Sequence, residues 1–146
     1  MSPSEYRCTS VAETQSIAAN LANSLPVGAV IALIGNLGSG KTTFTQGFAK
    51  GLRISEHVGS PTFKLVSEYD GKKGKLIHVD AYRLHGIDDF LNIGGEDILV
   101  TPNSIILIEW ADKLESILPP EAIRISFERV LDAENERVIS IMGLNT

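Results

Sequence analysis

Two continuous apolar runs mark the expected centre of the fold. They span residues 29–34 and 104–108, contain no charged side chain, and each follows a turn-forming glycine or asparagine. Runs of this length are typical of strands that are buried on both faces, as in a parallel sheet covered by helices. They therefore predict two central parallel strands of an α/β sheet.

Helical periodicity accompanies these strands. A Ser-Val-Ala-Glu capping box opens a helix that we expect at residues 10–24, and a second helical pattern runs from residue 42 to about residue 51. Residues 86–99 carry a mixed pattern interrupted by two glycines, which predicts a short helix and a turn. A further short helix is expected at residues 111–118, where two prolines end it.

Alternation of apolar and polar residues predicts strands with one exposed face. It occurs at residues 63–69 and 75–80, which a glycine-containing turn joins, and we expect a hairpin there. Residues 122–129 and 137–142 alternate in the same way and predict a closing antiparallel hairpin. The chain has no internal repeat or linker, so one domain is expected over residues 1–146.

Length and charge narrow the class of protein. The chain has 146 residues, of which 43% are hydrophobic, and this suits one compact domain with a core of its own. A formal net charge of −5 argues against a free-standing nucleic-acid binder, because such a protein needs a basic surface that neutralises phosphates. Any role on nucleic acid is therefore expected to run through partners.

The single cysteine and the lack of long apolar stretches bear on localisation. Cys8 has no second cysteine with which to form an internal disulfide, which fits a reducing cytoplasm, and we interpret it as a spare thiol near a mobile N-terminus. No apolar stretch reaches the roughly 18 residues that span a bilayer. Residues 1–5 also lack the parts of a signal peptide. We expect a soluble, cytoplasmic protein without membrane contact.

The candidate chemistry is concentrated in a glycine-rich segment between the first buried strand and the second helix. It reads Gly35-Asn36-Leu37-Gly38-Ser39-Gly40-Lys41-Thr42. Glycines let backbone N–H groups curl around phosphate oxygens, Lys41 would neutralise the β- and γ-phosphates, and the Thr42 hydroxyl would ligate Mg²⁺. The order of strand, loop and helix predicts a single P-loop NTPase-like α/β domain, in which helices flank a mostly parallel central sheet with antiparallel hairpin strands.

Two carboxylates end strands that point toward this loop. Asp80 closes the run 75–80, and Glu109 follows the apolar run 104–108. Ligands of open α/β sheets bind at the carboxyl ends of the strands, so either residue can hold Mg²⁺ or orient an attacking water. The sequence does not divide these two tasks between them.

Three other residues are candidates with an equally simple structural interpretation. Thr62 lies where nucleotide hydrolases place a segment that senses the γ-phosphate, but it also suits a plain turn. Arg83 is a candidate cation for a phosphate or for a partner's carboxylate, or an ordinary surface arginine. Trp110, beside Glu109, either covers the site or fills the core, and the core is the default for a lone tryptophan next to a buried strand.

Four motifs occur in order along the chain. They are Gly35 to Thr43, Ser60-Pro61-Thr62-Phe63, His78-Val79-Asp80-Ala81-Tyr82-Arg83-Leu84 and Ile108-Glu109-Trp110. Taken together they closely resemble the bacterial TsaE (YjeE) family, the small ATPase of tRNA threonylcarbamoyladenosine biosynthesis.

The resemblance implies a Mg²⁺-dependent ATP-binding protein with weak intrinsic hydrolysis. It would act with the TsaB and TsaD proteins, which install the threonylcarbamoyl group on adenosine 37 of ANN-decoding tRNAs, and it would meet tRNA only through them. By the same resemblance, Thr42 and Glu109 would contact the metal and Lys41 the phosphates. Activity would also need Thr43, Asp80 and Trp110, while the motif at residues 60–63 would be a nucleotide-responsive switch.

Three other functions compete with a regulatory ATPase. A small-molecule or nucleotide kinase needs an acceptor pocket and usually an arginine-bearing lid, and no arginine cluster follows the loop. A GTPase would carry an Asn-Lys-x-Asp element, which the chain lacks. A nucleotide-gated assembly module without catalysis differs from a slow ATPase only in whether Asp80 or Glu109 activates water.

Overall fold

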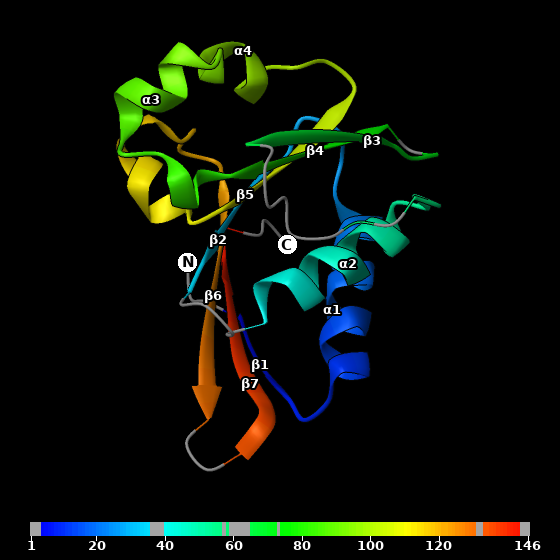
Figure 1. Ribbon diagram of the computed structural model, residues 1–146. Coiled ribbons are helices and arrows are strands. Elements are labelled where there is room, and N and C mark those ends of the chain that lie inside the picture. Colours follow the sequence, from blue (N-terminus) through cyan, green and yellow to red (C-terminus); the bar gives the residue numbers. More distant parts are fainter. Residues whose placement is uncertain are drawn as a thin grey trace.

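The computed structural model describes residues 4–35, 40–56, 58, 65–72, 74–130 and 133–143, and the side chains of residues 133–135 lie outside that description. Within these residues, seven strands form one sheet in the order β1-β7-β6-β2-β5-β4-β3 (Figure 1). The elements in chain order are β1 (Ser4–Cys8), α1 (Val11–Ser24), β2 (Val30–Ile34), α2 (Lys41–Gly51), β3 (Val66–Asp70), β4 (Lys75–Asp80), the 3-10 helix η1 (Ala81–Arg83), α3 (Ile87–Asn92), α4 (Gly95–Leu99), β5 (Ser104–Glu109), the 3-10 helix η2 (Ala111–Ile117), β6 (Ile123–Val130) and β7 (Ala133–Met142).

The four central strands of the sheet, β6, β2, β5 and β4, run parallel to one another. The two apolar runs form β2 and β5, which are neighbours, and this confirms the prediction of two central parallel strands. β3 pairs antiparallel with β4, and β7 with β6, as the two predicted hairpins require. β1 adds a further antiparallel strand beside β7. The sheet is therefore mixed, with a parallel centre.

Alternate residues of the central strands face two different apolar layers. Ile31 and Leu107 belong to the core under α1 and α2, whereas Ala32 and Ile108 belong to the core on the opposite face. Helices α3 and α4, together with η2, lie over that second face (Figure 1). Because both faces are covered, these strands need apolar residues at every position, and this explains their continuous apolar runs.

No pattern in residues 4–8 predicts the strand β1 that the structure contains. Its first four residues are exposed and only Cys8 is buried, so the segment carries no alternating apolar signal. The interpretation of Cys8 as a spare thiol near a mobile terminus is wrong. Its side chain is fully buried in the core under α1 and α2, and this burial raises the pKa of its thiol. Backbone pairing with β7 holds the strand in place.

Helix α1 begins as predicted, although only half of its capping box forms. The Ser10 hydroxyl accepts a hydrogen bond from the Glu13 N–H (3.1 Å), as an N-cap residue does. The Glu13 carboxylate accepts hydrogen bonds from the N–H (3.3 Å) and the hydroxyl of Thr9. Its side chain therefore reaches back to the residue before the cap.

Three further elements differ in detail from their predictions. Residues 111–117 form a 3-10 helix, and β7 begins at Ala133, so the closing hairpin has a shorter connection than expected. A second short helix, α4, follows the glycine pair in place of a simple turn. Gly94 adopts φ 85°, a left-handed conformation in which many helices end, and this separates α3 from α4.

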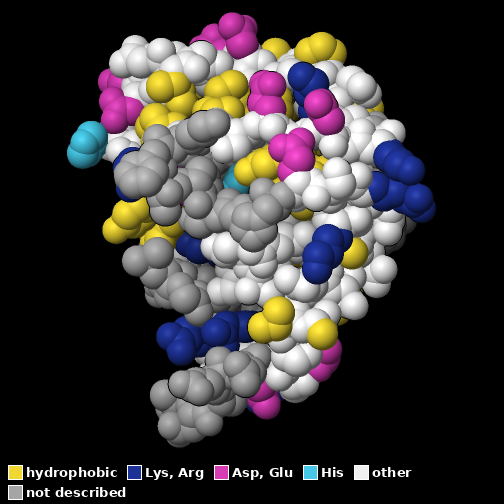
Figure 2. All heavy atoms as spheres, turned by 45° about the vertical axis from the view of Figure 1, so that its right-hand side comes forward, with side chains coloured by type: hydrophobic (Ala, Val, Ile, Leu, Met, Phe, Trp, Pro, Cys, Tyr) yellow, Lys and Arg dark blue, Asp and Glu magenta, His cyan; other side chains and the backbone are white. Residues whose placement is uncertain are grey.

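The face of the molecule drawn in Figure 2 shows no dominant basic region. Its lysine and arginine side chains lie in separate groups, and its carboxylates lie mainly in the upper part of the view. Among the residues that the structure describes, no helix is both long and apolar enough to cross a membrane.

Close packing of α1 against α2 depends on a glycine. A Cβ on Gly47 would lie 2.5 Å from the Cα of Gln15 and 2.6 Å from its carbonyl oxygen, and backbone atoms cannot turn aside. We expect Gly47→Ala to lower the free energy of unfolding by about 2 kcal/mol, because overpacking outweighs the gain of about 1 kcal/mol in helix propensity. Urea unfolding followed by circular dichroism measures this change.

The matched control for Gly47→Ala is Asn20→Ala, on the exposed side of α1. It should raise the free energy of unfolding by no more than about 0.7 kcal/mol, the gain in helix propensity from asparagine to alanine at an exposed position. A Gly47→Ala protein as stable as the wild type would contradict the close approach of the two helices.

Candidate functional site

The site is built around the passage from β2 into α2. β2 ends at Ile34, and α2 begins at Lys41 after an N-cap glycine, Gly40, whose φ of 106° is accessible mainly to glycine. The first turn of α2 has no side-chain cap and no acidic residue. Its backbone N–H groups therefore form the positive end of an 11-residue helix, a place that suits an anion. Residues 36–39 of the predicted loop lie outside the described residues.

Lys41 is held inside the site. The residue is only 5% exposed. Its Nζ donates a hydrogen bond to the Gly35 carbonyl oxygen (2.5 Å) and lies 3.5 Å from the centroid of the Trp110 ring, which is a cation–π contact. Both contacts hold the ammonium group beside the start of α2.

The charge on Lys41 is incompletely balanced by these contacts. Burial lowers the pKa of its ammonium group, while the negative charges of Glu109, Asp80 and Asp112 act in the opposite direction. Within the described part of the chain, no carboxylate lies within ion-pairing distance of Nζ. A buried cation is costly without a close counter-ion, so the site favours an incoming anion.

The two predicted carboxylates lie side by side at the same edge of the sheet. Asp80 and Glu109 end the parallel strands β4 and β5, and they occupy matching positions in the register. Glu109 is also opposite Leu33 of β2, near the point where the chain leaves that strand toward α2. The sheet topology therefore gathers both carboxylates where the phosphate loop begins, as expected for the carboxyl edge of a parallel sheet.

The surroundings of the two carboxylates differ. Glu109 is 4% exposed, and its Oε2 lies 2.6 Å from Nε2 of His78, a side chain that is fully buried. Asp80 is half-buried, and its Oδ1 accepts a hydrogen bond from the Tyr82 N–H (3.0 Å), which caps η1. One carboxylate is thus fixed inside the protein, while the other lies nearer the surface.

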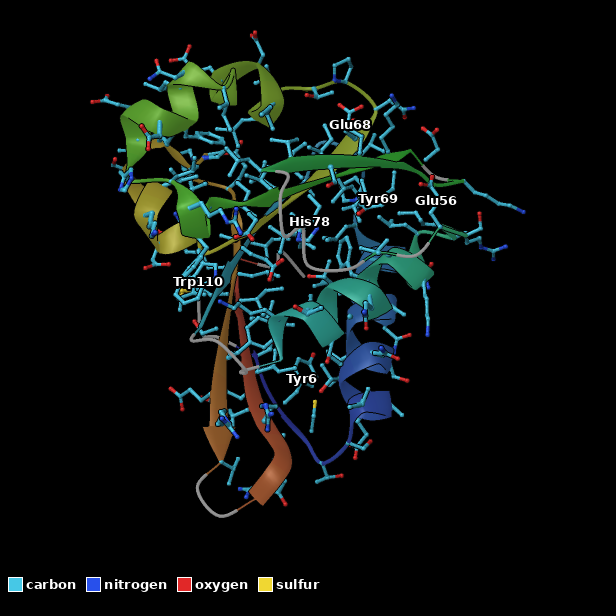
Figure 3. All side chains as sticks on the ribbon, viewed as in Figure 1. Tyr6, Glu56, Glu68, Tyr69, His78 and Trp110 are labelled. Atoms are coloured by element: carbon cyan, nitrogen blue, oxygen red, sulfur yellow. The ribbon has the colours of Figure 1, made fainter. Side chains whose placement is uncertain are left out.

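Trp110 both contributes to the core and covers the site. Its backbone has φ 60° and ψ 38°, a left-handed conformation that is strained for a residue with a side chain. The half-buried indole packs against the core under η2, and its ring centroid lies 4.9 Å from that of Tyr82 (Trp110 is labelled in Figure 3). Lys113 Nζ donates to the carbonyl oxygens of Tyr82 (2.6 Å) and Leu84 (3.1 Å), which ties η1 to η2.

The remaining predicted residues are placed as follows. Thr42 and Thr43 lie in the first turn of α2 and are half-buried. Arg83 is exposed on η1. Thr62 lies outside the described residues, as does the rest of its motif.

Arg137 reaches the site although no sequence signal points to it. It lies on β7, and a Cβ added to Gly40 would be 3.7 Å from both its Cγ and its Nε, so its side chain packs against the end of the loop. The motif around Lys41 cannot reveal this neighbour, because only the order of strands in the sheet brings β7 near α2. His78 belongs to a recognised motif, but its contact with Glu109 likewise emerges only from the pairing of β4 with β5.

The donor set suits Mg²⁺. Thr42 offers a hydroxyl at the start of α2, and Glu109 and Asp80 offer adjacent carboxylates. In the described part of the chain, no three His, Cys, Asp or Glu side chains gather into a metal cage. Mg²⁺ is usually bound by one or two carboxylates together with substrate phosphates and waters, and this small donor set fits that mode.

The fold and the site define a P-loop NTPase-like α/β domain: a parallel strand leads into a glycine-rich loop, and a buried lysine opens the next helix. Residues 8–139 match the family model described as threonylcarbamoyl adenosine biosynthesis protein TsaE. The chain belongs to the TsaE family.

Individual relatives agree with this assignment. A protein of Bacillus subtilis (strain 168) named tRNA threonylcarbamoyladenosine biosynthesis protein TsaE is 38% identical over 139 residues, which cover 95% of this chain and 86% of the relative. A protein of the same name from Aquifex aeolicus is 42% identical over 103 residues, which cover 69% of this chain and 71% of the relative. The crystal structure of Bacillus subtilis YdiB superposes with a TM-score of 0.77 at 36% identity, and the match covers 95% of this chain and 84% of that one.

Proposed function

We propose that this chain is a Mg²⁺-dependent ATP-binding protein with slow, partner-dependent ATPase activity that serves threonylcarbamoylation of adenosine 37 in ANN-decoding tRNAs. In this proposal it is a cytoplasmic protein of one domain that acts with TsaB and TsaD and meets tRNA only through them. The supporting observation is the buried Lys41 at the start of α2, in a chain whose relatives bear the name of this biosynthesis.

Binding is proposed to use the positive groups around the start of α2. Lys41 neutralises the β- and γ-phosphates, and the N–H groups of the first turn donate hydrogen bonds to phosphate oxygens. A phosphate oxygen competes with the Gly35 carbonyl for Lys41 Nζ, so nucleotide binding exchanges a hydrogen bond to a neutral acceptor for a stronger one to a charged acceptor. Thr43 and Arg137 flank the same turn and complete the proposed nucleotide contacts.

The two carboxylates are proposed to divide the chemistry of hydrolysis. Mg²⁺, when bound, supplies charge neutralisation on the phosphates, and Thr42 and Glu109 would hold it. Asp80 lies nearer the surface, and its Oδ1 accepts from Tyr82, so its second oxygen is suited to accept a hydrogen bond from the attacking water and orient it. The pairing of Asp80 with Glu109 in the register, which puts both carboxylates at one edge of the sheet, supports this proposed division.

The decisive experiment measures ATP hydrolysis by the purified chain with Mg²⁺, first alone and then with TsaB, TsaD and substrate tRNA. We expect slow turnover alone and stimulation by the partners. Binding of ATP without hydrolysis in either condition would favour a nucleotide-gated assembly module instead. Absence of ATP binding would refute the proposal altogether.

The pH dependence of binding provides a separate test. Only protonated Lys41 neutralises phosphate, and burial lowers the pKa of this group in the free protein. As pH rises through that lowered pKa, the association constant should fall by up to about tenfold per pH unit, beginning at a lower pH than an ordinary lysine would allow. Calorimetric titration of ATP from about pH 7.5 to about pH 10.4, where an ordinary lysine titrates, measures the trend above the last phosphate pKa, which is about 6. The titration is carried out without Mg²⁺ and at constant ionic strength.

Lys41→Arg is the control for the pH series, because a guanidinium stays charged over the whole range. Its affinity, whatever its absolute value, should be nearly constant with pH. A wild-type protein that shows equally constant affinity would contradict the role of the Lys41 charge.

A further inference from the structure

His78 lies deep in the protein, yet it contacts a residue of the proposed site. It precedes Asp80 by two positions on β4 and is opposite Leu107 in β5, while Asp80 is opposite Glu109. The His78 side chain has no exposed surface, and its Nε2 lies 2.6 Å from Glu109 Oε2. The contact therefore runs diagonally between two paired strands, on the face that α2 covers.

The chemistry of this contact defines which atom donates. A carboxylate only accepts hydrogen bonds, so His78 Nε2 carries the hydrogen that is shared with Glu109. The other ring nitrogen, Nδ1, is buried and finds no hydrogen-bond partner among the described residues. A hydrogen on Nδ1 would be a buried, unsatisfied donor, whereas a hydrogen on Nε2 is accepted by Glu109 Oε2.

The hydrogen bond restricts a flexible carboxylate. Fixing a glutamate side chain costs rotamer freedom, and a hydrogen-bond partner inside the fold offsets that cost before any ligand arrives. Because His78 engages Oε2, the other oxygen of Glu109, Oε1, is the one available to a metal, and the carboxylate keeps a consistent direction. Groups that hydrogen-bond a metal-binding carboxylate commonly change metal affinity or activity by 10- to 100-fold when removed.

We propose that His78 is a positioning residue that orients Glu109 toward the metal-bound nucleotide. This inference depends on the proposed function, because it assigns His78 a task within the same site. His78 does not itself touch the nucleotide or the reacting atoms. Its contribution is the direction of a carboxylate that would otherwise sample several rotamers.

Two substitutions of His78 separate the effect of losing the hydrogen bond from the effect of losing the ring. In His78→Gln the amide nitrogen reaches the position of Nε2 and can still donate to Glu109, whereas in His78→Asn the amide ends near the position of Nδ1 and falls short. We expect His78→Asn to weaken Mn²⁺ binding to the ADP-loaded full chain by about 10- to 100-fold, measured by electron paramagnetic resonance. His78→Gln should restore affinity to within a few-fold, and ADP affinity without metal should be unchanged in both.

The same two variants distinguish an effect on turnover from an effect on nucleotide binding. In ATP hydrolysis with TsaB, TsaD and tRNA, His78→Asn should lower kcat and raise the Mg²⁺ requirement while leaving the KM for ATP nearly constant. Equal behaviour of the two variants, whether both normal or both impaired, would overturn the positioning role. A wild-type chain that binds neither ATP nor Mn²⁺·ADP would instead refute the proposed function and leave the His78–Glu109 contact itself untouched.

A measurement on the wild-type protein keeps the inference testable if His78→Asn fails to fold. Long-range ¹⁵N–¹H NMR of the histidine rings reports which nitrogen carries the hydrogen. We expect His78 to carry it on Nε2 and its signals to shift when Mg²⁺ is added to the ADP-loaded chain, but little when ADP is added alone. A hydrogen on Nδ1, or no response to Mg²⁺, would overturn the proposal.

Discussion

Glu109→Gln is expected to bind ATP and to hydrolyse it at least about 100-fold more slowly than the wild type, the loss typical when a group that stabilises transition-state charge is removed. The substitution keeps the size of the side chain and removes its negative charge. The amide oxygen of the introduced glutamine, like Glu109 Oε2, can accept the hydrogen bond from His78 Nε2, so the fold around β4 and β5 should persist. What disappears is the charged oxygen that the proposed metal requires.

Single-turnover hydrolysis with TsaB, TsaD and substrate tRNA measures the effect of Glu109→Gln on the chemical step, and calorimetry measures ATP affinity separately. Glu115→Gln is the matched control, since Glu115 undergoes the same chemical change but lies exposed on η2, paired with Arg124. The control should hydrolyse ATP at the wild-type rate. Unchanged turnover in Glu109→Gln would remove Glu109 from the proposed mechanism.

Lys41→Ala should lower ATP affinity by about 30- to 100-fold, because a hydrogen bond to a charged group contributes about 2–3 kcal/mol and no second lysine lies in the first turn of α2. The loss should be similar with and without Mg²⁺, since the ammonium group acts on the phosphates directly. The fold should survive, because Lys41 contributes a buried charge rather than an apolar contact to α2.

Calorimetric titration with ATP compares Lys41→Ala with Lys50→Ala. Lys50 lies exposed in the last turn of the same helix, so its substitution removes the same charge far from the proposed phosphate site. Lys50→Ala should bind ATP within about twofold of the wild type, a change of less than about 0.5 kcal/mol. Equal affinity of Lys41→Ala and the wild type would refute the assignment of the phosphate loop.

The centre of the fold follows from the sequence because its signals are local. The apolar runs of β2 and β5 and the helical pattern of α2 each lie within one short segment, and the structure places all three as predicted. Strand β1 gives no such signal, because only Cys8 is buried and its position depends on pairing with the distant β7. Long-range backbone pairing leaves little trace in the pattern of a short outer strand.

The candidate site likewise contains residues that local sequence signals predict and contacts that they do not predict. Lys41 and the two carboxylates can be predicted because a motif or a strand end marks each of them. The link between His78 and Glu109 and the approach of Arg137 to Gly40 arise from the order of strands, which no single segment encodes. The left-handed backbone at Trp110 could not be predicted from residue propensities either, since a tryptophan rarely adopts this conformation.

The pairing of β1 with β7 has a consequence for synthesis on the ribosome. Ser4 is opposite Ile141, so β1 finds its hydrogen-bonding partner only when the much later β7 has been translated. The segments that carry the phosphate loop and both carboxylates emerge earlier, but the described sheet to which they belong cannot be completed until β7 has been made. Such distant pairings slow folding, because the chain loses the entropy of closing a long loop before the stabilising contacts form. Because β7 is the only strand beside β1 in the described sheet, the segment that ends at Cys8 lacks its backbone partner until β7 has emerged from the ribosome.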